Sequence, residues 1–435
     1  MNKKTENKAV SPWQWVPSLY FAQGIPYVVV MSVAVILFKR MGMSNTDIAL
    51  YTSGLNLPWV IKPLWSPLVD LLKTKRWWIV VMQILVGAGL AGIALTIQGP
   101  LAFRYCLAFM WLLAFSSATH DIAADGFYML GLNEKKQAYF VGIRNTFYRF
   151  AVIFGQGILV MFAGWLEQRY AREMPETAAI PQAWSLTFYL LTILFALLFV
   201  YHYLFLPHPR RDTCTLPPQQ ASAGRVFKEF LGTFTSFFQK KHIVSALIFI
   251  LLYRFAEAQL VKITSPFLLD TPATGGLALS TAEVGFIYGT IGVIALTIGG
   301  IVGGIAMARR GLKSCLWTMT IAMNLPNIVY LYLSFARPES IGIISGCVAI
   351  EQFGYGFGFT SLTYFMMLFS NGKHQTAHYA ICTGFMALGL MLPGMISGWI
   401  EESIGYRAFF VWIMLCTIPS FWATHLVRKN LTDNH

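Results

Sequence analysis

The sequence predicts an all-α polytopic membrane protein with about twelve transmembrane helices in two six-helix halves. Hydrophobic residues make up 56% of its 435 residues, and charged residues make up only 12%. A soluble domain carries about 25% charged residues, so most of this surface must face something other than water. Two further observations support the prediction: a regular succession of long apolar runs, and two short sequence patterns that recur in the second half.

The apolar runs are long enough to cross a bilayer, which takes about 20 residues per helix. In the first half the predicted spans are 14–38, 45–68, 77–98, 102–131, 137–165 and 183–206. In the second half they are 242–268, 281–308, 313–335, 341–369, 374–400 and 405–427.

Lysine and arginine in the connections predict the orientation of the chain, because cytoplasmic loops are enriched in these residues. With the N-terminus inside, the inside segments hold roughly twenty such residues and the outside loops roughly seven. We therefore expect both termini to be cytoplasmic. Lys39 and Arg40, which fall in an outside loop, are the local exception.

The longest polar connection, 207–241, separates an N-terminal bundle (1–206) from a C-terminal bundle (242–435). Its apolar residues recur at helical spacing between basic flanks; they are Phe227, Phe230, Leu231, Phe234, Phe237 and Phe238. This pattern favours an amphipathic helix on an anionic membrane surface. A solvated linker with an apolar patch is the alternative.

Two short patterns recur at nearly the same offset. The segment 43–50 resembles 279–286, and each begins a predicted span with a Ser and an acid at capping-box spacing. Gly-Trp-Leu-Glu at 164–167 likewise resembles Gly-Trp-Ile-Glu at 398–401. Two parallel six-span halves around a site at the membrane midplane are the architecture of the major facilitator superfamily.

Several motifs of soluble enzymes are absent or misplaced. The GxGxxG pattern at 87–92 lies inside an apolar span with no preceding strand, so it does not indicate a dinucleotide site. The six cysteines are dispersed without metal-ligand spacing. The net charge of +13 resides largely in short connections, where it sets topology. We therefore expect no catalytic residues, no cofactor, no metal and no nucleic-acid partner.

The informative residues are the ionisable ones within spans, because a charge at the bilayer centre costs roughly 2.5–3.5 kcal/mol and normally faces a cavity or a partner. They are Lys62, Asp121, Asp125, Arg144, Arg149, Arg254, Glu257, Lys262 and Glu351. Asp121 and Asp125 share one helix face, where two like charges disfavour simultaneous ionisation unless a cation intervenes. Arg144 and Arg149 are natural partners for them. Arg254 and Glu257 have the spacing of an intrahelical pair.

These residues fall in segments that resemble AmpG-type permeases. The resemblance lies in Phe-Ala-Gln-Gly-Ile-Pro at 21–26, Trp-Ser-Pro-Leu-Val-Asp at 65–70, Ala-Thr-His-Asp-Ile-Ala-Ala-Asp at 118–125, Tyr148-Arg149, and Glu351 followed by Gly354, Gly356 and Gly358. His120 departs from the family's glutamine; a histidine packed in the core is the alternative to a site role. Some AmpG permeases also have two more spans.

The resemblance implies proton-driven import of anhydro-muropeptides, an anionic amino-sugar/peptide conjugate, across the bacterial inner membrane for cell-wall recycling. We expect its partners to be a small-molecule substrate, protons and membrane lipids, and we expect the protein to be a monomer. A siderophore or other sugar-conjugate importer is the alternative within the fold. A membrane-embedded enzyme or a muropeptide sensor are alternatives from other classes.

The resemblance and the intramembrane charges together suggest roles for individual residues. Candidates for proton coupling are Asp121, Asp125, Glu351 and Glu257. Candidates for substrate binding are Arg144, Arg149, Arg254, Lys262, Lys62, Asn56, Gln83, Gln156 and Trp59, in which arginine suits bidentate recognition of carboxylates. Candidates for a conformational clamp at the cytoplasmic ends of spans are Asp70, Lys73, Arg76, Arg309 and Arg310. For Arg254 and Glu257, a purely structural pair is the alternative.

Overall fold

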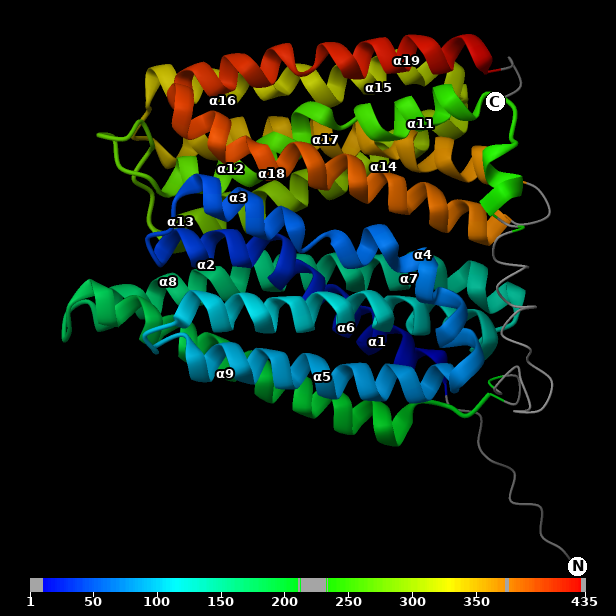
Figure 1. The fold of residues 1–435 in the computed structure, drawn as a ribbon, viewed down its shortest axis with the longest axis horizontal. Coiled ribbons are helices and arrows are strands. Elements are labelled where there is room, and N and C mark those ends of the chain that lie inside the picture. Colours follow the sequence, from blue (N-terminus) through cyan, green and yellow to red (C-terminus); the bar gives the residue numbers. More distant parts are fainter. Residues whose placement is uncertain (1–10, 210–211, 213–231, 233, 372–374, 432–435) are drawn as a thin grey trace, which may run out of the picture.

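A computed structural model describes residues 11–209, 212, 232, 234–371 and 375–431. All regular secondary structure in these ranges is helical, and the helices lie roughly parallel in two stacked bundles (Figure 1). Both ends of the described chain lie at one end of the molecule, which we call the tail end (Figure 1). The opposite end, which carries the connection between α2 and α3, is called the far end.

The N-terminal bundle contains six spanning units. They are α1 (Pro12–Val28) with η1 (Val29–Val33) and α2 (Ala34–Arg40); α3 (Asn45–Gly54) with α4 (Leu57–Leu72); α5 (Lys75–Thr96); α6 (Ala102–Gly131); α7 (Glu134–Val152) with η2 (Ile153–Ile158) and α8 (Leu159–Tyr170); and α9 (Glu176–Phe205).

The C-terminal bundle repeats this arrangement. Its units are α11 (Ile243–Leu252) with α12 (Phe255–Leu269); α13 (Thr281–Val284) with η3 (Gly285–Gly292) and α14 (Val293–Arg310); α15 (Leu312–Asn324) with η4 (Leu325–Asn327) and α16 (Ile328–Ala336); α17 (Ile341–Ser370); and α18 (Gln375–Leu415) followed by α19 (Ile418–Asn430). The backbone leaves helical geometry at Gly405, inside α18, and this divides the last two spans.

The prediction of an all-α protein with about twelve spans is confirmed over the described residues. Nine helical stretches there are long and apolar enough to cross a membrane, and one of them, Ala377–Asn430, contains two predicted spans. Neither the α3–α4 unit nor α17 is among the nine. The first is interrupted between Gly54 and Leu57, and the second is rich in glycine and polar residues.

Several spans are interrupted near mid-depth, and these interruptions position polar groups. The π-helical segments η2 and η3 pack on one another, since a Cβ at Gly289 would collide with the backbone of Gln156. Such π-bulges are frequent at functional sites. The break between α11 and α12 leaves Arg254 in a non-helical conformation (φ −108°, ψ 22°).

A shared apolar cluster joins the two bundles at the far end, and α18 also contacts α4 further along, where a Cβ at Gly384 would lie 2.8 Å from the Val60 carbonyl oxygen. One hydrophobic cluster contains buried residues of both bundles, among them Val33, Ile48, Phe267 and Tyr406. At the tail end each bundle has its own cluster, around Phe127 in the N-terminal bundle and around Phe249 in the C-terminal bundle. Among the described residues, every hydrogen bond between the bundles also lies at the far end. The molecule is therefore closed at the far end.

The connection 207–241 is described only in part. Phe227, Phe230 and Leu231 lie outside the described residues, so the amphipathic helix stays a prediction. Phe237 is fully buried and stacks on Phe385 of α18, with ring centroids 6.4 Å apart. This end of the connection therefore packs on the C-terminal bundle.

Candidate substrate and coupling site

The intramembrane charges of the N-terminal bundle form two adjacent groups on α6. Asp121 is bound by Lys62 of α4, with Nζ and Oδ2 3.2 Å apart, and Gln23 of α1 donates to its other oxygen. The side chains of Lys62 and Asp121 are 24% and 19% exposed. The bent α3–α4 unit brings Lys62 to this acid, a pairing not expected from the sequence.

One turn further along α6, Asp125 binds a tyrosine and an arginine. Its Oδ1 accepts a hydrogen bond from Tyr20 of α1 at 3.1 Å and lies 3.4 Å from Arg144 Nη1 of α7. The Arg144 guanidinium also lies over the rings of Tyr20 and Tyr128, 4.9 and 5.1 Å from their centroids. The side chain of Asp125 is 44% exposed, so this carboxylate remains accessible.

In the C-terminal bundle, Arg254 is held by aromatic side chains of α17. Its guanidinium lies 5.0 Å from the ring centroids of both Tyr355 and Phe359, and Nη2 donates to the Tyr355 hydroxyl. No ion pair within 4 Å joins Arg254 to Glu257 in the described chain. The helix break at Arg254 explains this, because the i, i+3 superposition requires continuous helix.

Two acids of this bundle are almost fully buried. Glu351 Oε2 accepts hydrogen bonds from Tyr330 at 3.1 Å and from Gln352 at 2.9 Å. Glu351 Oε1 and Glu257 Oε2 are buried without a hydrogen-bond partner among the described residues. A charge in this position is costly unless it is paired, so the two acids are suited to carrying a proton. Lys262 on α12 is 2% exposed and has no carboxylate within 4 Å in the described chain.

Aromatic residues of the N-terminal bundle lie near these charges. Tyr27 of α1 packs edge-on against Trp59 of α4, with centroids 5.3 Å apart, and also contacts Tyr148 of α7. Tyr27 lies within electrostatic range of Asp121 and Arg149 in its own bundle and of Arg254 in the other. The charges of both bundles therefore face one shared region.

Three other predicted binding residues lie in different surroundings. Gln83 of α5 is 1% exposed, and its amide binds His120 and His202 at 3.2 and 2.8 Å. Asn56 donates to the Ser53 carbonyl where α3 ends. Gln156 is buried in η2 against Gly289. The structure thus places Gln83 inside the N-terminal bundle, and Asn56 and Gln156 at helix irregularities.

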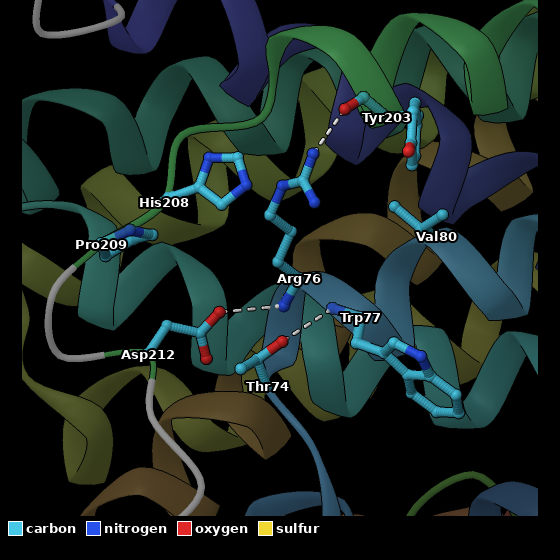
Figure 2. Close-up of a pocket in the computed structure, with 8 residues that line it drawn as sticks. All are labelled: Thr74, Arg76, Trp77, Val80, Tyr203, His208, Pro209 and Asp212. Carbon is cyan, nitrogen blue, oxygen red and sulfur yellow. Dashed lines mark hydrogen bonds between the residues drawn. The ribbon is translucent and has the colours of Figure 1, made fainter. Parts of the chain in front are cut away.

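The predicted clamp lies at the tail end. Arg76 donates to the carbonyls of Tyr203 and Leu206, and Asp212 accepts from the backbone N–H groups of Lys75 and Arg76. Figure 2 shows the hydrogen bonds of Arg76 with Tyr203 and with Asp212. Arg76, Tyr203 and Asp212 are among the residues that line a small pocket of about 230 Å³. The Lys73 ammonium lies 6.0 Å from the Trp77 ring.

The remaining members of the predicted clamp are Arg309, Arg310 and Asp70. Arg309 and Arg310 end α14, exposed and without a carboxylate within 4 Å in the described chain. The side chain of Asp70 lies outside the described residues. The clamp therefore stays a prediction.

Sequence reasoning missed the tyrosines that bind the charges. Tyr20, Tyr330 and Tyr355 each donate to a charged group or accept from one. Aromatic residues are common in spans, so nothing in the sequence marks these three. Gln23 could have been found, because it lies within the 21–26 motif.

Comparison with known proteins identifies the family. The family model described as Major Facilitator Superfamily matches residues 18–377. The chain is 25% identical over 427 residues to the putative transporter AmpG 4 of Rickettsia felis, with 95% of each chain covered. It is 24% identical over 420 residues to the anhydromuropeptide permease of Escherichia coli K12, covering 95% of this chain and 79% of that one.

A solved structure shows the same fold. A POT family transporter matches with a TM-score of 0.71 at 10% sequence identity, with 96% of each chain covered. The predicted superfamily fold and the resemblance to AmpG-type permeases are confirmed. The chain belongs to the Major Facilitator Superfamily and is a multi-pass secondary transporter, not an enzyme.

Proposed function

We propose that this transporter imports an anionic amino-sugar/peptide conjugate of the anhydro-muropeptide type by symport with protons, working as a monomer in the bacterial inner membrane. The tail end would face the cytoplasm and the far end the periplasm, as the distribution of Lys and Arg predicts. The names of the AmpG relatives support the substrate class.

The observation that carries the proposal is the shared region between the bundles. Arg149 of one bundle and Arg254 of the other both lie within electrostatic range of Tyr27 there. Two cations, one from each bundle, suit a substrate with more than one carboxylate. Trp59 and Tyr27 offer ring faces and a hydroxyl for a sugar. Lys62 and Lys262 would add positive charge at the edges of this shared region.

The coupling step would take place at Asp125. Protonation neutralises its carboxylate and weakens the contact with Arg144, which is 3.4 Å away. The freed guanidinium could then bind substrate or let α7 move relative to α6. Asp121 has its own cation in Lys62 and is a second candidate. Glu351 and Glu257 are the candidates in the C-terminal bundle, where protonation would remove an unpaired buried charge instead of releasing a cation.

Uptake of labelled anhydro-muropeptide into proteoliposomes tests the proposal. An inward proton gradient should drive accumulation, and Asp125→Asn should abolish accumulation while leaving counterflow exchange. Glu339→Gln is the matched control, since this acid is exposed in the loop before α17. No uptake by folded protein above empty liposomes would refute the substrate class, and uptake of an iron-loaded siderophore would favour the alternative.

A further inference from the structure

The two recurring sequence patterns meet one another at the far end. Gly164 and Glu167 of α8 lie on the start of α13, where a Cβ at Gly164 would collide with the backbone of Ala282. We call this contact the first clamp. Gly398 and Glu401 of α18 lie in the same way on the start of α3, against Asn45. We call this the second clamp. Each bundle thus contacts the other through equivalent residues. These two clamps at the far end are distinct from the clamp predicted at the tail end.

In the first clamp a cation binds the buried carboxylate directly, and the same arginine, Arg40, also binds Glu176 at 2.9 Å. Glu167 Oε2 accepts from Thr281 Oγ1 at 2.7 Å and lies 3.1 Å from Arg40 Nε. Its other oxygen accepts from Trp184 Nε1 at 2.8 Å. A direct cation and two neutral donors compensate for the desolvation of this carboxylate, whose side chain is only 7% exposed.

The second clamp lacks the corresponding cation. Glu401 is 4% exposed and accepts from Asn45 Nδ2 at 2.6 Å. No Lys, Arg or His nitrogen lies within 4 Å of it in the described part of the chain. The nearby Lys39 is engaged instead with Asp270 Oδ2 at 2.7 Å and with Asn45 Oδ1 at 2.8 Å.

Four ionisable groups lie near Glu401, and the two carboxylates among them make its ionised form less favourable still. They are Lys39 of α2, Asp270 at the end of α12, and Glu402 and Tyr406 of α18. The Tyr406 hydroxyl donates to Asp270 at 2.6 Å, and Glu402 accepts from the Thr46 N–H at 3.1 Å. The surroundings of Glu401 therefore hold two further carboxylates and one ammonium group, and that ammonium group is bound to Asp270.

We propose that Glu401 is a proton-binding site that links closure of the far end to the pH on that side of the membrane. The closed clamp holds a neutral carboxyl, whose carbonyl oxygen still accepts from Asn45. When the clamp opens, Glu401 becomes hydrated and returns the proton to water on the same side. The assignment of that side to the periplasm rests on the proposed function; the linkage itself does not.

Matched substitutions in the two clamps test the proposal. Glu401→Gln imitates the protonated carboxyl and keeps the acceptor for Asn45. Glu167→Gln removes the charge that binds Arg40. Pulsed electron paramagnetic resonance on spin labels at Glu173→Cys and Glu339→Cys, exposed positions at the far end of each bundle, reports opening. The native cysteines are replaced by alanine, and the protein is in nanodiscs without substrate from about pH 5 to 8.

With one linked proton, the closed-to-open ratio changes by up to tenfold per pH unit. We expect the parent protein to close as pH falls, Glu401→Gln to stay closed with little pH dependence, and Glu167→Gln to open while keeping the pH dependence. An unchanged pH dependence in Glu401→Gln, or opening like that of Glu167→Gln, would overturn the proposal.

A second variant keeps the proposal testable if Glu401→Gln does not fold. Glu402→Gln removes one negative neighbour of Glu401, so the pH midpoint of closure should move to lower pH with an unchanged slope. A midpoint that stays where it is would count against the proposal. Because no substrate is present, failure of muropeptide transport would leave this test unaffected.

Discussion

Close packing of α14 on α17 leads to a prediction about two neighbouring glycines. A Cβ at Gly303 would lie 2.7 Å from the Phe357 carbonyl oxygen and 2.9 Å from Thr360 Oγ1. A Cβ at the next residue, Gly304, would meet nothing within 4 Å. Gly303→Ala and Gly304→Ala therefore make the same chemical change in the same helix, in a crowded and in an open position.

The size of the difference follows from two opposing effects. Alanine is favoured over glycine in a helix interior by about 1 kcal/mol, and this applies to both positions. At Gly303 the new methyl group meets backbone of α17, which cannot rotate away, and overpacking costs about 1–3 kcal/mol. We expect Gly304→Ala to be neutral or stabilising, and Gly303→Ala to be less stable than Gly304→Ala by about 1–3 kcal/mol.

Thermal unfolding in detergent, followed by tryptophan fluorescence, measures the difference as a shift in Tm. The Tm of Gly303→Ala should be a few degrees below that of Gly304→Ala, since about 1 kcal/mol corresponds to about 2–4 °C in a protein of moderate size. Equal Tm values for the two variants would refute the claim that glycine at 303 sets the approach of these helices.

The remaining predictions concern the site. Arg254→Lys keeps the positive charge but loses the stacking on Tyr355 and Phe359, which is worth about 1–2 kcal/mol, so KM for an anionic substrate should rise about tenfold. Arg407→Lys is the control: it loses a similar stack on Phe335 away from the site and should leave KM unchanged. Gln83→Leu removes the amide between His120 and His202 and should lower stability by about 1–3 kcal/mol; a rise in KM with unchanged Tm would instead place Gln83 in contact with substrate. Asp125→Asn should abolish gradient-driven accumulation and retain exchange, and concentrative uptake at the parent level would assign the coupling proton to another acid.

The sequence was sufficient for the positions of the spans and for the list of intramembrane charges. Both follow from local properties, since a bilayer admits only long apolar helices and tolerates few charges. The two recurring patterns also predicted the two-bundle organisation. Their contact with one another could not be predicted, because a repeat does not specify which surface of one bundle meets the other.

Charge pairing was predicted less well, because the partners belong to different helices. Asp125 pairs with Arg144 as expected, but Asp121 pairs with Lys62, which the bent α3–α4 unit carries to it. Arg254 and Glu257 have the spacing of a pair, and the break before α12 separates them.

Lys39 and Arg40 show most clearly what the sequence determines and what the tertiary structure determines. The sequence alone marked them as basic residues in a loop where few are expected. The tertiary structure gives the reason: Lys39 binds Asp270 of the other bundle, and Arg40 binds Glu167 in the clamp that holds α13. Composition and periodicity determine which segments enter the membrane, because each helix satisfies its own backbone. Only the packing of the two bundles decides which charges meet, because those contacts join residues more than a hundred positions apart in the chain.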